Sequence, residues 1–333
     1  MKHLFRLIFK NFKYAFNGIY SFIHQKTVRG CSRMKILPYL IILTSFLLGQ
    51  KLLAAGCCGG GNGGNALLGS EQKSLLSWEL SRKEVIVSSV SGKGLWQKPS
   101  DPQKVTTQVL AYSMLISDLW QMFVNFPVIQ REQNGKRFQN LGDVKVGAAY
   151  EFLPDWDYNP LRPRGLIYFG VSAPTGRAPQ ESREGGLDST GTGFWDFATG
   201  FQLNKSWVSF DASFNLAAHQ SLQRKFDSPE NSQTVIPGPG GSLSFGGGYT
   251  IGNHRIGSQL AQTIESPQKI QTDQSSIESG QEEYATFSLN YSWSASDTDQ
   301  LAIAYSDQTL FGDPKNTSLS RALSINLVHF WNR

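Results

Sequence analysis

The chain has 333 residues and a formal net charge of +5, and its basic excess lies at the beginning. Residues 1–56 hold nine of the 31 basic side chains and none of the 26 acidic ones, which leaves a net charge of −4 for residues 57–333. A nucleic-acid-binding domain is therefore not indicated. The hydrophobic (40%), charged (17%) and aromatic (12%) contents exclude a disordered chain, a coiled coil and collagen, and they disfavour an ordinary α/β enzyme.

The first predicted element is an export signal. The apolar run 36–49 is shorter than the roughly 20 residues of a membrane-spanning helix. Basic residues precede it and the small residues Ala54-Ala55-Gly56 follow it, as in a secretory signal peptide. We expect residues 1–56 to be the leader, with Met34 as the true start; a longer, genuine basic region before the apolar run is the alternative. A Gly-rich tether (57–70) and one exported domain (71–333) then follow.

Cys57 stands directly after the small residues that end the leader. This arrangement resembles a bacterial lipobox, which makes Cys57 the candidate for lipidation; plain cleavage before Cys57 is the alternative. No cysteine follows Cys58, so the body has neither a disulfide framework nor a cysteine metal site. We expect no metal and no cofactor.

The body shows apolar and polar residues in alternation, the period of a strand with two unlike faces. The pattern is clearest in 143–152, 207–216, 285–294 and the final segment around 323–327. Turn residues divide the body into twelve predicted strands, at about 74–90, 105–115, 119–130, 141–153, 165–175, 193–204, 206–219, 241–251, 254–265, 283–295, 300–311 and 319–332.

The connections between these strands alternate between long and short. The long, polar ones are 91–104, 131–140, 176–192, 220–240, 266–282 and 312–318, and the short ones include 116–118, Lys205, 252–253 and 296–299. The segment 154–164 is the exception, since it is long for the short side. Such alternation is typical of barrels of the outer membrane, and an even strand number returns both ends of the barrel to the periplasmic side.

The residue types on the two predicted faces distinguish a membrane barrel from a soluble β-sandwich, which also alternates. The polar face is rich in small residues rather than in long charged side chains. Tryptophans gather at strand ends, where an aromatic girdle would meet the membrane interfaces. The girdle residues are Trp120, Trp195, Trp207, Trp293 and Trp331. We therefore predict an all-β fold: a closed, antiparallel, up-and-down transmembrane β-barrel of about 12 strands in a Gram-negative outer membrane.

The predicted lumen receives the polar face. Its charged candidates are Glu79, Asp143, Lys145, Glu151, Asp196, Asp211 and Arg255, and its neutral ones include Gln108, Gln121, Asn125, Asn215, Gln259 and Asn290. Five acids against two bases favour cations if the lumen is open. The alternative is an ion-paired filling that blocks flow.

Two motifs resemble a known family. Leu141-Gly-Asp-Val-Lys-Val-Gly-Ala-Ala-Tyr-Glu-Phe-Leu153 and Ser172-Ala-Pro-Thr-Gly176 are similar to strand motifs of the outer-membrane transporters named for the phenol-degradation meta-pathway. The resemblance implies an outer-membrane β-barrel that passes small, often hydrophobic, molecules. The final strand, which ends in Phe330-Trp331, resembles the signal that such barrels present to the barrel-insertion machinery. We expect that machinery, outer-membrane lipids and small-molecule solutes as partners, and no nucleic acid.

Three functions remain open at this stage: a channel or transporter, a structural or surface-interaction barrel that uses loops 220–240 and 266–282, and a lipid-modifying hydrolase. The hydrolase needs a His beside a Ser and an orienting acid or amide. The body offers His219, which is near Ser221, as well as His254 and His329. No catalytic residue is predicted, because none of these shows the spacing of a triad.

Overall fold

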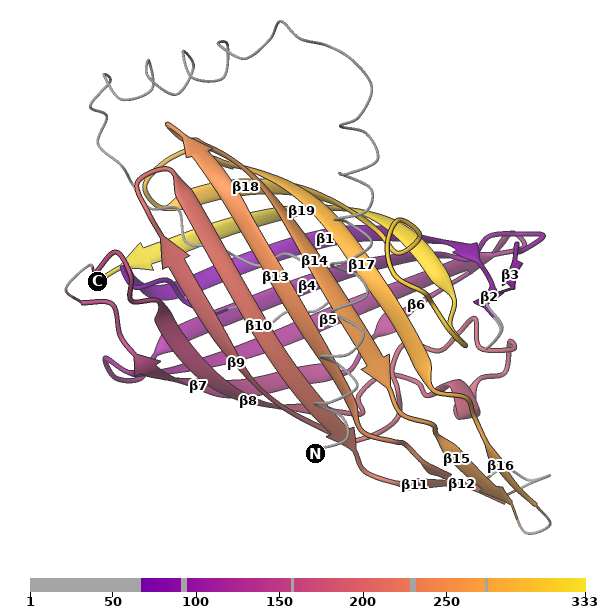
Figure 1. Ribbon diagram of the computed structural model, residues 1–333. Helices are drawn as coiled ribbons and strands as arrows, with labels where there is room; N and C mark the ends of the chain where they lie inside the picture. Colours follow the sequence, from indigo (N-terminus) through magenta and orange to yellow (C-terminus); the bar gives the residue numbers. More distant parts are fainter. Residues whose placement is uncertain (1–66, 91–94, 157–158, 228–231, 273–274) are drawn as a thin grey trace, which may run out of the picture. The chain divides into compact units, whose positions relative to one another are not determined.

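The computed structural model describes residues 67–90, 95–156, 159–227, 232–272 and 275–333. Twelve antiparallel strands form a closed barrel in these ranges (Figure 1). The strands are β1 (Gln72–Val87), β4 (Lys104–Leu115), β5 (Trp120–Gln133), β7 (Val144–Leu153), β8 (Arg164–Ala173), β9 (Asp196–Ser206), β10 (Phe210–Ser221), β13 (Gly240–Ile251), β14 (His254–Glu265), β17 (Glu282–Ser294), β18 (Asp299–Asp307) and β19 (Leu319–Asn332).

Each strand pairs with its neighbours in the chain, and the pairing of β1 with β19 closes the ring. The predicted fold class, strand number and up-and-down order are confirmed, because each of the twelve predicted segments corresponds to one barrel strand. The short turns and both described chain ends lie at one end of the barrel, which we call the short-turn end. The opposite end is the long-loop end.

The long connections carry additional strands. β6 (Lys136–Leu141) continues the hairpin with β5 beyond the barrel. β11 (Arg224–Asp227), β12 (Ser232–Ile236), β15 (Lys269–Thr272) and β16 (Ser276–Glu278) form a separate four-stranded sheet, and β2 (Ser89–Val90) pairs with β3 (Trp96–Gln97). The only helical element in the described ranges is the 3₁₀ turn η1 (Pro179–Glu181), and no helix there is long and apolar enough to cross a membrane.

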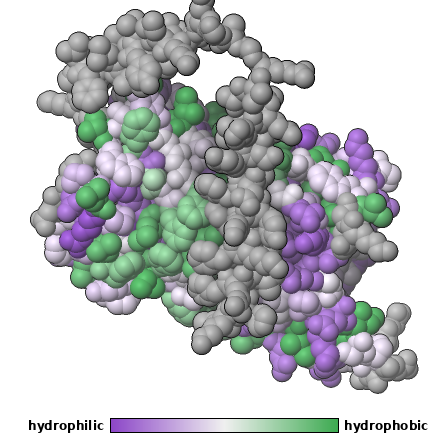
Figure 2. All heavy atoms as spheres, viewed as in Figure 1, coloured by the Kyte–Doolittle hydropathy of each residue, from purple (hydrophilic) through white to green (hydrophobic). Residues whose placement is uncertain are grey.

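The barrel is apolar outside and polar inside. In β5, the outward residues Trp120, Met122 and Phe126 are 45–50% exposed, whereas the inward residues Gln121 and Asn125 are at most 5% exposed. The same alternation places Ile167 and Phe169 of β8 outside. Hydrophobic atoms gather on the part of the wall that is visible in Figure 2, and hydrophilic atoms gather toward the long loops. A water-facing barrel with this surface would leave a large apolar area exposed, so the outer face is suited to lipid.

Three details differ from the sequence-based expectation. The turn expected at Lys205 lies at 207–209, because β9 extends to Ser206. The expected loop 131–140 is mostly the β5–β6 hairpin. Gln108 is exposed and pairs with Leu80 and Val128, which places it on the outer face with Leu110 rather than in the lumen. Val105 and Val109 take the inward positions of β4, so residue type alone gave the wrong face there.

Candidate functional site: the barrel lumen

The inner face of the barrel carries most of the charged residues that the sequence assigned to it. Six of these lie on the inward side of their strands: Glu79, Lys145, Glu151, Asp196, Asp211 and Arg255. The seventh, Asp143, lies in the turn before β7. Whether these residues line an open pathway for solutes stays a prediction.

A buried ion pair lies at the short-turn end of β7 and β8. Nε and Nη2 of Arg164 donate to the two carboxylate oxygens of Glu151 at 2.9 and 2.6 Å. The two side chains are only 8% and 4% exposed. The planar guanidinium matches the carboxylate in this two-point contact. The pair therefore belongs to the packed filling of the barrel rather than to a water-filled surface.

The chain segment before β1 enters the same end of the lumen. Leu68 accepts a hydrogen bond from Nη1 of Arg164 at 2.6 Å, and its N–H donates to the side-chain oxygen of Gln121 at 2.7 Å. Its side chain packs with Leu75, Val328 and Phe330. Leu68 thus contacts β5, β8, β1 and β19, which spans almost half of the ring. A residue held in this way obstructs the short-turn end of the lumen.

A second bidentate pair lies on the far wall near the same end. Arg255 donates to both oxygens of Asp211 at 2.7 Å, and its third nitrogen donates to Asn290 at 2.7 Å. Gly248 and Gly257 leave room for the guanidinium, since a Cβ at either position would come within 2.7 Å of it. The charges at the short-turn end are thus neutralised in pairs.

Besides Phe330 at the short-turn end and Tyr284 at the long-loop end, two aromatic rings point into the middle of the lumen. Phe123 is 3% exposed and lies over Gly147, where a Cβ would overlap the ring. Tyr168 lies over Gly200 in the same way, and its hydroxyl donates to Asn215 at 3.1 Å. These rings replace side chains that the inward glycines lack, so the middle of the lumen is narrowed by packed aromatic groups.

His219 is held between two carboxylates near the long-loop end. Nδ1 lies 3.1 Å from Asp196 and Nε2 lies 3.0 Å from Glu265, while the Ser221 hydroxyl donates to Asp196 at 2.8 Å. A Ser-His-acid triad requires the serine to bond the histidine, with one ring nitrogen free to accept its proton. Here both nitrogens are occupied by acids and Ser221 is bonded elsewhere. The geometry is therefore that of a structural bridge and not of a hydrolase.

The two family-like motifs contact each other. The hydroxyl of Thr175 donates to the Gly142 carbonyl at 2.6 Å and accepts from the Val144 N–H at 3.0 Å. Asp143 accepts hydrogen bonds from the N–H of Gly176 at 3.0 Å and from the N–H and hydroxyl of Thr192 at 2.6 and 3.0 Å. The motifs thus fasten the β8–β9 connection, residues 174–195, to the turn before β7.

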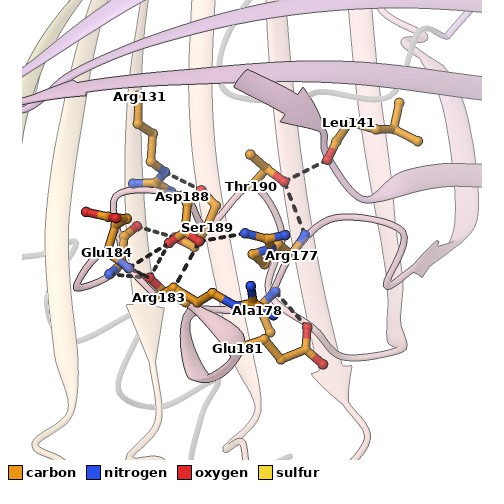
Figure 3. Close-up of polar contacts among 12 residues, drawn as sticks. Arg131, Leu141, Arg177, Ala178, Glu181, Arg183, Glu184, Asp188, Ser189 and Thr190 are labelled. Carbon is orange, nitrogen blue, oxygen red and sulfur yellow. Dashed lines mark hydrogen bonds and ion pairs between the residues drawn. The ribbon is translucent and has the colours of Figure 1, made fainter. Parts of the chain in front are cut away.

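This connection, which we call the β8–β9 loop, folds against inward-facing groups. Nε of Arg131, on the inner face of β5, donates to the Ser189 carbonyl at 2.7 Å, and the Thr190 hydroxyl donates to the Leu141 carbonyl at 2.7 Å (Figure 3). Inside the loop, Asp188 receives hydrogen bonds from Arg177 at 2.7 Å and from Ser182. Burial alone would raise the pKa of Asp188, but these bonds and backbone amides outweigh it and hold that pKa well below its usual range.

The five tryptophans assigned to the girdle are 41–50% exposed. Trp120, Trp207, Trp293 and Trp331 lie at the short-turn end, and Trp195 precedes β9 at the long-loop end. Their contact with lipid headgroups stays a prediction. His329, close to Trp331, contacts Asp299 at 2.8 Å at the same rim.

The sequence-based interpretation missed several lumen residues. Arg164 was included in the turn 154–164, although it shares the face of Leu166 and Tyr168. Counting alternation back from those residues could have identified it. The same applies to the inward-facing residues Lys83, Arg131, Glu265 and Glu282. By contrast, no sequence signal indicates that Leu68 enters the barrel.

Comparisons with known proteins agree with this fold. No protein-family profile matches the chain. The structure is similar to that of an outer-membrane channel from Pseudomonas putida F1, with a TM-score of 0.63, 13% sequence identity, and coverage of 82% of this chain and 99% of that chain. It is also similar to the transport unit of the autotransporter AIDA-I from Escherichia coli, with a TM-score of 0.48, 7% identity, and coverage of 78% and 91%. At this identity the first likeness shows the fold alone.

Proposed function

We propose that the protein is an outer-membrane channel for small solutes, exported by its N-terminal leader and placed with its short-turn end toward the periplasm. The observation that carries this proposal is the polarity of the two faces: an apolar outer wall surrounds an inner face that bears acids, bases, amides and aromatic rings. Lys83 and Lys145 face inward without an ion pair to a described residue, and a structural barrel does not need such groups, because burying an unpaired charge costs free energy.

The substrate class follows from the width and the lining. Twelve strands enclose a lumen that is wider than that of an eight-stranded barrel and much narrower than that of a 16-stranded porin. Phe123 and Tyr168 narrow it further, and Leu68 obstructs one end. Solutes would therefore pass singly, and passage requires Leu68 to move. The resemblance to the meta-pathway transporters suggests hydrophobic solutes among them.

Conductance of the purified, folded protein in a planar bilayer tests this proposal. We expect small single-channel steps, and liposomes that contain the protein should swell in small solutes but not in larger sugars. If neither ions nor solutes pass, the channel function is wrong. A surface-interaction role would then be favoured, and the four-stranded sheet β11–β12–β15–β16 would be its contact surface.

The export steps have their own test. Incorporation of labelled palmitate in a Gram-negative host, and its loss in Cys57→Ser, would establish lipidation of Cys57. Incorporation in neither protein would support plain signal cleavage. Residues 1–66 lie outside the described residues, so this part of the proposal depends on the sequence alone.

A further inference from the structure

The charged groups of the lumen are arranged differently at its two ends. At the short-turn end, Arg164 and Arg255 each form a bidentate pair with a carboxylate. In the long-loop half, the basic and acidic side chains occupy separate sectors of the wall. This half is also more open, since the side chains of His219 and Glu265 are 33% and 32% exposed. Glu79, at the middle of β1, is the one inward acid without an ion pair on the strands of the basic sector, and it lies nearer the short-turn end than Lys83.

The basic sector spans β1 to β7. Lys83 and Arg131 lie in one row of the sheet, because both pair with Val105 of the intervening strand. Lys145 lies on the next strand, β7, on the inward side. None of these three residues forms an ion pair with another described residue. Lys145 nevertheless interacts electrostatically with Asp196, which lies in the same row of the sheet two strands away. Arg131 is instead bonded to two neutral oxygens, those of Ser189 and Gln103.

The acidic sector spans β9 to β17. Asp196 starts β9, and Glu265 and Glu282 pair directly across β14 and β17. His219 bridges Asp196 and Glu265, so it offsets at most one of the three negative charges. Gly240 provides the space for this bridge, since a Cβ there would overlap both Glu265 and His219.

Apart from Asp196, which lies only two strands from Lys145, the two sectors face each other across the ring. In the circular order of twelve strands, β5 lies six places from β14 and β7 lies six places from β17. Arg131 is therefore opposite Glu265, and Lys145 is opposite Glu282. The β8–β9 loop changes this contrast little. Most of its charged side chains form ion pairs, Arg177 with Asp188, Glu184 with Lys136 and Glu181 with Arg224. This leaves Arg183 as its one further charged side chain.

We propose that this transverse charge separation makes the long-loop half of the lumen a filter for dipolar solutes, that is, small molecules with a cationic and an anionic group. A simple ion is attracted by one wall and repelled by the other, so the channel should discriminate weakly between cations and anions. A zwitterion is attracted at both ends when it aligns with the field. This inference rests on the proposed channel function and names the substrate class of that channel.

Single neutralisations test the filter with little risk to folding. Glu282→Gln removes an acid and Lys83→Gln removes a base, and neither residue forms an ion pair with a described residue. The matched control is Glu84→Gln, which follows Lys83 in β1 and points to the outer face. Folding of each variant is checked by the shift of the unheated protein on SDS gels.

The first measurement is the cation-to-anion permeability ratio, from reversal potentials in potassium chloride gradients near 0.01 M, where screening is weak. A unit charge on the order of 10 Å away in water changes an ion's partition about twofold, in opposite directions for the two signs. We expect the ratio to fall about fourfold in Glu282→Gln, to rise about fourfold in Lys83→Gln and to stay unchanged in the control.

The second measurement compares liposome swelling in glycine and in its neutral isomer glycolamide. We expect the unmodified protein and the control to pass glycine faster, and both lumen variants to lose part of that preference. The filter proposal is wrong, although the channel function stands, if the protein conducts but two results are seen. The cation-to-anion permeability ratio is the same in both lumen variants as in the unmodified protein, and glycine passes no faster than glycolamide. If the unmodified protein passes neither ions nor solutes, both proposals fail.

Discussion

The buried pair of Arg164 and Glu151 allows a quantitative prediction. Replacing Arg164 with Met leaves the Glu151 carboxylate 4% exposed without its cation, and it also removes the donor to the Leu68 carbonyl. Breaking a buried pair on one side costs about 3–5 kcal/mol, because the remaining charge is desolvated and uncompensated. We expect the free energy of unfolding to fall by about that amount.

The double variant Glu151→Leu/Arg164→Met removes both charges together. Its loss should be smaller, below about 2 kcal/mol, because no isolated charge remains in the filling. The control is Arg82→Met, whose partner Glu132 lies 3.9 Å away with both side chains well exposed. Such a surface pair contributes at most about 1 kcal/mol.

Equilibrium urea unfolding in detergent, followed by tryptophan fluorescence and by the gel shift of the folded barrel, measures these differences. Two results would refute the reasoning. One is an Arg164→Met variant as stable as the Arg82→Met control. The other is a double variant less stable than Arg164→Met alone, which would mean that the charge left behind is not what destabilises the single variant.

Of three further predictions, one concerns the obstruction by Leu68 and two concern the β8–β9 loop. Leu68→Gly should increase single-channel conductance, since it removes the side chain that packs with Leu75 and Phe330; an unchanged conductance would show that Leu68 does not limit flow. Asp143→Ala should speed tryptic cleavage within the β8–β9 loop several-fold, because three hydrogen bonds to the loop are lost; equal cleavage rates would contradict this role. Folding lowers the pKa of Asp188, so its ionised carboxylate stabilises the folded loop. This stabilisation is complete above the unfolded pKa of about 3.9 and is lost as the pH falls through the lower folded pKa. Amide exchange in the loop, corrected for its intrinsic pH dependence, should therefore stay slow at pH 5 and become fast at pH 5 in Asp188→Asn.

The inward glycines show how far residue types can be interpreted without a structure. The sequence placed Gly147 on the polar face, and that face is indeed inward. It did not indicate that Phe123 fills the space over Gly147, because a phenylalanine inside the barrel breaks the expected pattern of apolar residues outside. The odd or even position of a residue predicted its face correctly where apolar and polar residues alternate over a long run, as in β10 and β17. It failed in β4, where valines face inward and Gln108 faces outward.

The sequence by itself determined the barrel: the strand number, the antiparallel order, the alternation of long and short connections and the face of most strands. These features depend on local periodicity and on turn residues, both of which involve only residues that are close together in the sequence. Only the tertiary structure decided which lumen charges are paired, that Leu68 enters the ring and that the β8–β9 loop folds against Arg131. Those contacts join strands that are neighbours or opposites only after closure. From the sequence, the lumen was expected to hold an excess of acids. In the structure, the charges are paired at the short-turn end and separated into a basic and an acidic sector in the long-loop half.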